Sequence, residues 1–357
     1  MFDFFPCYTS LTSSKSKVAE LFECLYDVSI PISSDIFFGL NLGWPKFNLP
    51  TNYQQYVISF HTEYLDHNWV IQQATSVYPK RITLISDFAI NPGPAWPDNI
   101  TFIQQRTIHK QLAISAEKHG VNRNITLPHY KFSSLSFRVS QYKIFVTAFL
   151  LKNVATDDIV LTFHNQVLGN VATWPPNIPE LQDLKLEISP TFINFDDEFT
   201  LEKNLPVANA DWNCVPYQNA LVNLTNESFH HSSSMIGNIP VVLPGPYFTE
   251  KMFKPLLAGR PFISVNQFAS VNELQQLGFR TDFGFSHDYD TEVGDFERIA
   301  KIFKTISQVN QTPIADLFDS SIDAVTHNVN HIVSGNLLSV CKGLNRQHLP
   351  ALIAHCT

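Results

Sequence analysis

The chain has 357 residues, which is long enough for two domains. Hydrophobic residues make up 44% of it and 29 residues are Phe, so it can build sizeable cores and does not have the composition of a disordered chain. Its formal net charge of −8 argues against a protein whose whole surface binds nucleic acid.

The cysteines and the N-terminal residues indicate a reducing compartment. No Cys-x-x-Cys pair is present, so neither a zinc knuckle nor a redox motif is indicated, and we expect free thiols. Residues 1–6 lack the basic residues and the long apolar run of a signal peptide. The apolar run 144–151 is too short to span a membrane. We therefore predict a cytoplasmic protein without a membrane span.

The first part of the chain is hard to interpret up to residue 54, and residues 30–50 are loop-like because they are rich in Pro and Gly. From there strands and helices alternate. The predicted strands are 56–60, 81–86 and 100–103, and the predicted helices are 67–78 and 108–119. Residues 120–128 are the best candidate for a linker.

A second series of strands and helices follows this linker. Its predicted strands are 131–139, 158–163, 220–224, 239–243 and 262–265. Its predicted helices are 141–152, 248–258, 271–277 and 295–309, with a mostly helical tail over 314–355. Residues 165–205 contain four prolines and are predicted to be irregular.

Two such series joined by a linker predict an α/β protein with two doubly wound domains. The predicted domains are residues 1–128 and 129–331. In sheets of this kind, ligands bind at the carboxyl ends of the strands.

The run from Tyr247 to Ile263 is the most informative part of the sequence. It places Thr249, Glu250, Lys251 and Lys254 at the start of a predicted helix. The unpaired N–H groups and positive dipole end of a helix start suit a diphosphate, with Thr249 as the N-cap. Lys251 or Lys254 can add a point charge, and Glu250 can accept hydrogen bonds from the hydroxyls of a ribose. The pattern indicates a nucleotide-sugar site.

Two further residues bear on the shape of this helix. Pro255 lacks an N–H group, so it is expected to kink the helix or to mark a later start. Gly259 is expected to cap the carboxyl end of the helix rather than contact a ligand.

The segment contains Thr-Glu-Lys, a short predicted helix, Ala-Gly, one further residue and then Pro. This pattern resembles the donor-binding segment of α1,3-fucosyltransferase-like and related glycosyltransferases of bacteria, phages and large viruses. The resemblance continues through residues 275–282 and 288–290. It is weaker at residues 132–138, where relatives tend to carry a strand ending in Asn-Arg. In total it covers roughly residues 130–310.

The resemblance implies the glycosyltransferase-B arrangement, in which two Rossmann-like domains face a cleft. Residues 1–128 would then handle the acceptor, residues 129–331 the donor, and a C-terminal helix in 332–357 would cross back to the first domain. The implied activity is metal-independent transfer of a hexose or pentose from a UDP- or GDP-linked donor to a hydroxyl, with no tightly bound cofactor. For a viral or phage protein, the compartment would be the host cytoplasm.

Two basic residues are candidates for binding the diphosphate. Arg138 ends the first strand of the second series, at the carboxyl edge, and a guanidinium can donate two parallel hydrogen bonds to phosphate. Lys143 lies five residues further on, in the first turns of the next helix. A cation or a helix end at this place can replace a metal ion.

A general base for the acceptor hydroxyl is expected at the ends of the first strands. Glu63 is the first candidate, followed by Asp66 and His61, all just after strand 56–60. Asp87 ends strand 81–86 in the equivalent position. Each of them is otherwise a polar loop residue or a helix cap.

Asp288-Tyr289-Asp290 has the spacing of a metal-binding Asp-x-Asp motif, because two carboxylates at alternate positions can bind Mg²⁺ or Mn²⁺. The triplet follows the donor helix in a polar stretch, so we predict a structural loop here and no metal.

The acceptor stays open between a glycan, a lipid, a protein and modified DNA. For a hydroxymethylated base in DNA, part of a basic surface is available between Arg106 and Lys131. The alternative for that stretch is a solvated helix face followed by a loop. A different class of function is a non-catalytic scaffold that only binds nucleotide or glycan.

Overall fold

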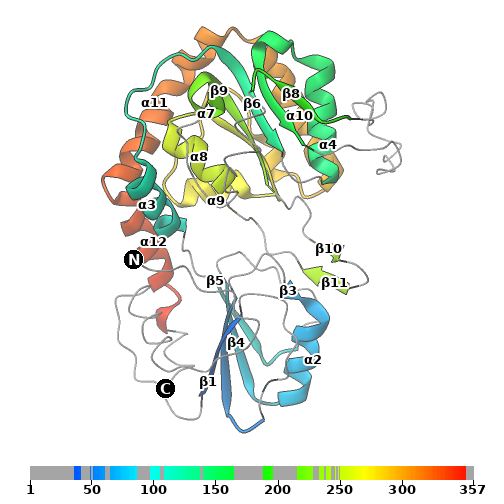
Figure 1. Ribbon diagram of the computed structural model, residues 1–357. Helices are drawn as coiled ribbons and strands as arrows, with labels where there is room; N and C mark the ends of the chain where they lie inside the picture. Colours follow the sequence, from blue (N-terminus) through cyan, green and yellow to red (C-terminus); the bar gives the residue numbers. More distant parts are fainter. Residues whose placement is uncertain are drawn as a thin grey trace. The chain divides into compact units, whose positions relative to one another are not determined.

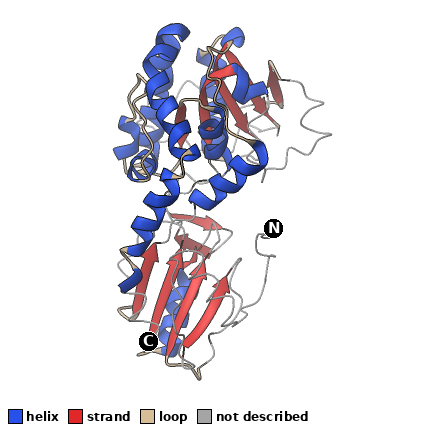
Figure 2. Cartoon of the chain, turned by 90° about the vertical axis from the view of Figure 1, so that its left-hand side faces the viewer, coloured by secondary structure: helices blue, strands red, loops and turns tan. Residues whose placement is uncertain are grey.

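The protein is described by a computed structural model. It covers residues 36–41, 49, 51–60, 65–86, 97–104, 108–136, 140–164, 188–195, 215–227, 233–236, 239–242, 246, 248 and 250–350. The fold is of the mixed α/β class, with parallel-strand sheets and helices (Figures 1 and 2). This confirms the predicted α/β class.

The chain divides into two compact units. The first contains residues 1–109, 231–245 and 338–357, and the second contains residues 110–230 and 246–337. The first division falls inside helix α3 (Ile108–His119), whereas the sequence suggested one near residue 128. Each unit therefore takes its residues from more than one stretch of the chain.

The main sheet of the first unit is parallel throughout, in the order β1-β2-β4-β5. Its strands are β1 (Ile36–Asn41), β2 (Gln55–Phe60), β4 (Arg81–Ser86) and β5 (Ile100–Gln104). Helix α2 (His67–Val77) lies against one face, as Figure 2 shows. A small antiparallel sheet of the same unit pairs β10 (Ser233–Ile236), β11 (Ile239–Val242) and β3 (Leu65–Asp66).

Apolar residues at two different periods build the core of this unit. Tyr56 and Ile58 alternate along β2, so both point to one face of the sheet. On α2, Val70, Ala74 and Val77 recur at spacings of four and three, which places them on one helix face. All five are at most 3% exposed, so the helix and the sheet bury their apolar sides against each other.

The second unit contains a five-stranded sheet in the order β12-β9-β6-β7-β8. Four strands are parallel, and β8 runs antiparallel at one edge. The strands are β6 (Tyr130–Ser136), β7 (Ile159–Phe163), β8 (Thr191–Ile193), β9 (Ala220–Asn226) and β12 (Phe262–Val265).

Helices cover both faces of this sheet. They are α4 (Gln141–Asn153), α7 (Val215–Asn219), α8 (Glu250–Ala258), α9 (Ser270–Gln276), α10 (Asp295–Gln311) and α11 (Ile314–Val333), with α12 (Asn336–Arg346) continuing into the first unit. Short 3₁₀ turns are η1 (Thr156–Asp158) and η2 (Asp288–Thr291). Helices α4 and α10 pack together, whereas α8 packs with α7 and α11 (Figure 1). Because parallel crossovers are right-handed and those through α4 and α8 run in opposite directions, these helices lie on opposite faces.

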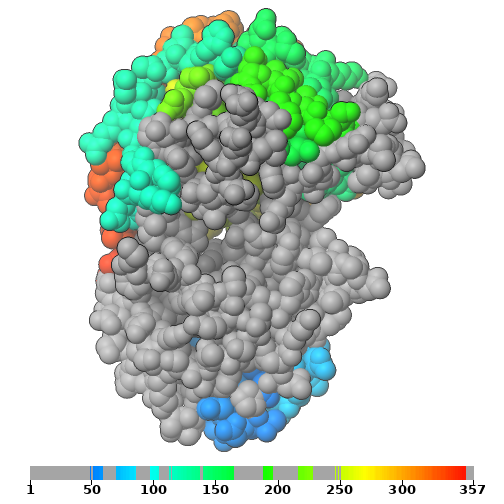
Figure 3. Space-filling view, in the orientation of Figure 1, coloured from blue at the N-terminus to red at the C-terminus, as the bar shows by residue number. Residues whose placement is uncertain are grey.

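Residues 120–128, the predicted linker, are fastened to the second unit. The backbone N–H of Asn122 donates to the carbonyl of Leu257 (2.8 Å), and its side-chain Nδ2 donates to the carbonyl of Ala258 (3.0 Å). These carbonyls at the end of α8 have no partner within the helix. Gly259 follows with a φ of +64°, which confirms it as the helix cap. The cyan surface of α3 and the segment after it is visible in Figure 3.

Arg260 ties the same segment to α7. Its guanidinium donates to the carbonyls of Thr126 (2.8 Å), Tyr217 (3.2 Å) and Gln218 (2.6 Å). Burial lowers the pKa of Arg260 to about 10, so the side chain keeps its charge near neutral pH. The stretch 120–128 is thus part of a packed unit.

Most predicted elements are confirmed, and the errors have recognisable causes. The helix predicted at 248–258 begins at Glu250 and runs through Pro255, so the later start considered for it is wrong. The range 30–50 contains β1, which glycine and proline concealed, and the range 165–205 contains β8. The elements α7, β3 and β10 were not predicted, because five or fewer residues carry little periodicity.

Candidate functional site

The strand order of the five-stranded sheet reverses between β6 and β9. From β6 the chain passes through α4 to β7 on one side, and from β9 it reaches β12 through α8 on the other side. In an open parallel sheet, such a reversal leaves a crevice outside the carboxyl ends of the two central strands, and ligands bind there. The candidate site is therefore built from the ends of β6 and β9.

Two helices begin at the same edge of the sheet. Helix α4 follows β6, and α8 precedes the parallel strand β12, so both present their N-termini at the carboxyl ends of the strands. Lys143 lies in the first turn of α4 and is only 3% exposed, and Lys251 lies in the first turn of α8. Helix dipoles and ammonium groups together favour an anionic ligand at this edge.

Lys251 meets a carboxylate that the sequence did not single out. Glu227 directly follows β9, and its side chain is fully buried. The Nζ atom of Lys251 lies 3.7 Å from Oε2 of Glu227. A buried carboxylate is costly unless a cation or a donor balances it. The pair therefore holds the ammonium of Lys251 close to the end of β9.

The strands that meet at the reversal have a polar interior. Ser133, Ser134 and Ser136 of β6 are at most 2% exposed, and so are Asn223 and Asn226 of β9. Strands of a parallel sheet covered on both faces are normally continuous runs of Val, Ile and Leu. Polar residues in such a place call for an explanation other than packing.

Hydrogen bonds join these side chains in two groups. On one face, Oγ of Ser133 donates to Oδ1 of Asn223 (2.6 Å). On the other face, Nδ2 of Asn226 donates to Oγ of Ser134 (2.9 Å) and, less favourably, to Oγ of Ser136 (3.4 Å). Among the described residues, Nδ2 of Asn223 and Oδ1 of Asn226 have no hydrogen-bond partner.

Lys254, a predicted phosphate ligand, lies one turn after Lys251 and is 9% exposed. Its Nζ lies 5.7 Å from the ring centroid of Tyr217, close enough for a cation–π contact. Tyr217 packs with Ala258 and Leu135. The role of Lys254 toward a ligand stays a prediction.

Other residues predicted to bind the donor lie partly or wholly outside the described part of the chain. Arg138 and Thr249 are outside it. Glu250 is the first residue of α8, and only its backbone is described.

The candidates for the general base belong to the first unit. His61, Glu63 and Asp87 lie outside the described residues, and of Asp66 only the backbone is described. Asp66 is the last residue of β3, where it pairs with Val241 directly before α2.

The strands that lead to these base candidates end level with each other. Phe60 of β2 and Ser86 of β4 are paired in the register of the sheet. These two strand ends therefore lie at the same edge of the sheet.

Asp290, the second carboxylate of the Asp-x-Asp triplet, caps a helix. Its Oδ1 accepts hydrogen bonds from the backbone N–H of Val271 (2.7 Å) and from Oγ of Ser270 (3.1 Å), and its Oδ2 accepts from the N–H of Asn272 (2.8 Å). Burial raises the pKa of Asp290, and these donors oppose that effect. The carboxylate satisfies the first turn of α9, which is the structural role that the sequence suggested.

The half-buried His287 and the buried Tyr289 form a chain that ends on β12. The backbone N–H of Ser264 donates to Oη of Tyr289 (3.0 Å), which lies 2.8 Å from Nδ1 of His287. Nε2 of His287 lies 3.0 Å from the carbonyl of Thr281, so it carries the proton, and Nδ1 accepts from Tyr289. Burial lowers the pKa of His287 to about 4, so the ring is neutral at pH 7.

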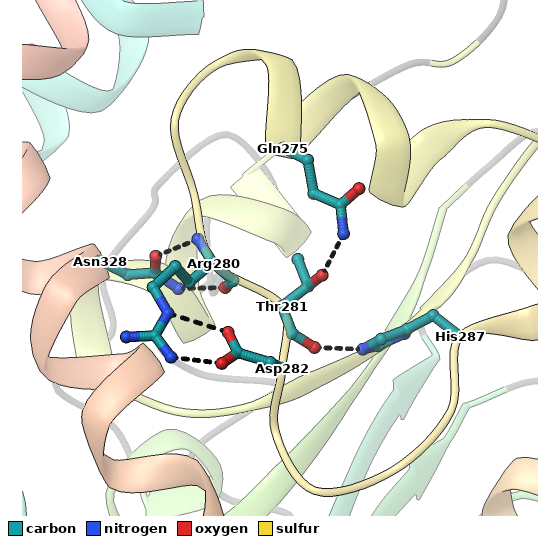
Figure 4. A network of polar contacts seen from close by, with 6 residues as sticks. All are labelled: Gln275, Arg280, Thr281, Asp282, His287 and Asn328. Carbon is teal, nitrogen blue, oxygen red and sulfur yellow. Dashed lines mark hydrogen bonds and ion pairs between the residues drawn. The ribbon is translucent and has the colours of Figure 1, made fainter.

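A depression of about 490 Å³ lies beside this chain, and its lining includes none of the polar residues of β6 and β9. Its lining residues are Gln275, Phe279, Arg280, Thr281, Asp282, His287 and Asp288. Figure 4 shows that the polar groups here bind one another: Arg280 pairs with Asp282, and Thr281 bonds both Gln275 and His287. Asn328 fixes the backbone of Arg280 through both its N–H and its carbonyl. These groups hold a turn, so we place the candidate site at the strand reversal instead.

Part of the basic strip considered for DNA is internal. Lys131 is 8% exposed, and its Nζ donates to the carbonyl of Asn310 (2.7 Å). Lys118 and Arg123 are exposed. Lys131 is therefore not available to a phosphate backbone.

Asn226 and Glu227 are the residues of the site that the sequence analysis missed. The strand was predicted to end at Leu224, whereas β9 continues to Asn226. A usable signal was present, since Ser and Asn inside otherwise apolar strands recur in both 131–136 and 220–226.

Comparisons with models of protein families, with curated proteins and with solved structures find no significant match. Among the described residues, no group of three or more His, Cys, Asp or Glu side chains is arranged to hold a metal ion. None of the described helices is long and apolar enough to cross a membrane.

Proposed function

We propose that the protein is a glycosyltransferase that moves a sugar from a UDP- or GDP-linked donor to a hydroxyl acceptor without a metal ion. The proposal includes two Rossmann-like domains, with the donor held by the second unit. It combines the resemblance of the 247–263 segment with the geometry at the strand reversal. The observation that carries it is Lys251, which belongs to the motif and pairs with buried Glu227 at the end of β9.

The chemistry of the transfer fits the groups at this edge. Cleavage of the bond between sugar and diphosphate leaves negative charge on the diphosphate, and preorganised cations and N–H groups stabilise it. Lys251 and the N-terminus of α8 would provide this stabilisation, and Lys143 at the start of α4 would add to it. Glu250 would accept hydrogen bonds from the ribose.

Titration calorimetry with a panel of UDP- and GDP-linked sugars tests the donor site. We expect Lys251→Ala and Glu250→Ala each to weaken binding by about 1–3 kcal/mol, as for the loss of charged hydrogen bonds. Lys301→Ala is the matched control. Lys301 also forms an ion pair with a glutamate, since its Nζ lies 2.8 Å from Oε2 of Glu292, but Lys301 belongs to α10 and not to the candidate site. The donor site is rejected if the wild-type protein binds none of the panel, or if Lys251→Ala and Lys301→Ala have equal affinities.

Catalysis needs a separate measurement, the release of nucleoside diphosphate in the presence of acceptors. Alanine at the residue that acts as the base among His61, Glu63, Asp66 and Asp87 should slow transfer by roughly 10²–10⁴-fold while donor affinity is kept. Donor binding without release under any condition would instead indicate a non-catalytic nucleotide-binding protein.

A further inference from the structure

Asn226 has a feature that the fold alone does not explain. It is the last residue of β9 and is 1% exposed, yet its Oδ1 has no hydrogen-bond partner among the described residues. Leaving a buried carbonyl oxygen without a hydrogen-bond partner destabilises the folded protein. An apolar residue would fit a buried strand of a parallel sheet better.

The other end of the same carboxamide is fixed in place. Nδ2 of Asn226 donates to Oγ of Ser134 on the neighbouring strand β6 (2.9 Å). Ser134 is itself 1% exposed. The two strands that hold this group are those between which the strand order reverses, so the carboxamide is a rigid group at the predicted crevice.

We propose that Asn226 contacts the ligand, and that its Oδ1 accepts a hydrogen bond from a hydroxyl of the bound nucleotide sugar. This inference rests on the proposed function. A carboxamide oxygen repels phosphate oxygens, so its partner must be a donor. The cations Lys251 and Lys143 and the helix N-termini take the diphosphate, and Asn226 takes a hydroxyl.

The hydroxyl can belong to the ribose or to the transferred sugar. Calorimetry with UDP and GDP, and with their sugar conjugates, distinguishes these two sources. If the variant loses affinity for the free nucleoside diphosphate and for the conjugate alike, the hydroxyl is on the ribose. If only the conjugate binds more weakly, the hydroxyl is on the sugar.

Asn226→Ala should weaken binding by about 10-fold, the usual effect of one lost hydrogen bond to a buried group. The matched control is Asn223→Ala on the same strand. Asn223 is also 1% exposed and also has an unsatisfied amide group, but it lies three residues away and so on the opposite face. Its removal should leave ligand affinity unchanged.

A second variant separates ligand contact from a structural role. Asn226→Val removes the unsatisfied oxygen and suits a buried strand. Without ligand it should melt at or above the temperature of the wild-type protein, whereas its affinity should fall as for Asn226→Ala. A residue with a purely structural role would instead lower the melting temperature.

The outcomes distinguish the inference from the function on which it rests. Wild-type binding with unchanged affinity in both Asn226 variants, while Lys251→Ala binds weakly, overturns the role of Asn226 and leaves the donor site standing. Equal losses in the Asn226 and Asn223 variants also overturn it. A wild-type protein that binds no nucleotide or nucleotide sugar overturns both.

Discussion

The main sheets of the two units differ in strand order and in the side chains that they bury. In the first unit the described strands follow one another across the sheet as β1, β2, β4 and β5, and its core is mainly apolar. In the second unit the order reverses between β6 and β9, and these strands bury serine and asparagine. Where the strand order runs in one direction across a sheet, apolar packing is enough to explain the buried residues. Where the strand order reverses, a crevice forms at the carboxyl ends of the strands, and a ligand can bind there.

The largest expected effects concern what holds each sheet together. Ile58→Ala in β2 should cost about 3 kcal/mol, because it leaves a cavity in the core formed with Val70 and Leu84. Ser134→Ala in β6 should cost less, about 1–2 kcal/mol, because it leaves Nδ2 of Asn226 with only its longer hydrogen bond to Ser136. Both residues are 1% exposed, so they form a matched pair.

Hydrogen exchange measured by mass spectrometry separates the two units. Peptides of β2 and β4 should lose protection in Ile58→Ala, and peptides of β6 and β9 should not. If Ser134→Ala lost more protection from exchange than Ile58→Ala, the proposed difference between an apolar and a polar sheet would be wrong.

The stability of the second unit should depend on pH through His287. In the folded protein its pKa is lowered from 6.5 to about 4, so the unfolded chain takes up a proton that the folded chain excludes. The contribution of His287 to the free energy of unfolding is therefore fully present above pH 6.5, and it is lost as the pH drops from 6.5 to 4. Because the residue is partly exposed, we expect a loss of roughly 2 kcal/mol.

Urea unfolding of the wild-type protein and of His287→Gln at pH 7 and pH 4.5 measures this effect. Glutamine keeps a donor and an acceptor but does not titrate, so the variant should lose less stability on acidification. The same acid loss in both proteins would assign the effect to carboxylates elsewhere.

The smallest expected effect concerns the segment 120–128. Asn122→Ala removes the hydrogen bond to the carbonyl of Ala258 and should cost about 1 kcal/mol. Asn124→Ala, at an exposed position two residues later, should change stability by less than about 0.5 kcal/mol. Equal free energies of unfolding for the two variants would mean that the hydrogen bond of Asn122 does not stabilise the second unit.

Much of the secondary structure was predictable because it rests on local patterns. The strands at 81–86 and 262–265 and the helix at 108–119 match their predicted bounds. The start of α8 near Glu250 and its end at Gly259 followed from capping chemistry within a few residues. The candidate site was predictable in part, since Lys251 was chosen for its place in the resembled motif and in the first turn of that helix.

Glu227 and Asn226 could not be chosen in the same way, because nothing near them in the sequence shows which strand lies beside β9. Their importance comes from β6 and α8, whose nearest ends lie more than twenty residues away on the two sides. Strands β10 and β11 follow β9 in the chain but group with the first unit, because β11 pairs with β3.

The sequence by itself determined the α/β class, the alternation of strands and helices, and a cationic helix start, because each depends on side chains a few residues apart. The order of the strands, the pairing of Lys251 with Glu227 and the unsatisfied oxygen of Asn226 were decided only by the tertiary structure. A strand has the same two-residue period whatever its neighbour is, so only long-range pairing selects which polar residues meet at the edge of the sheet.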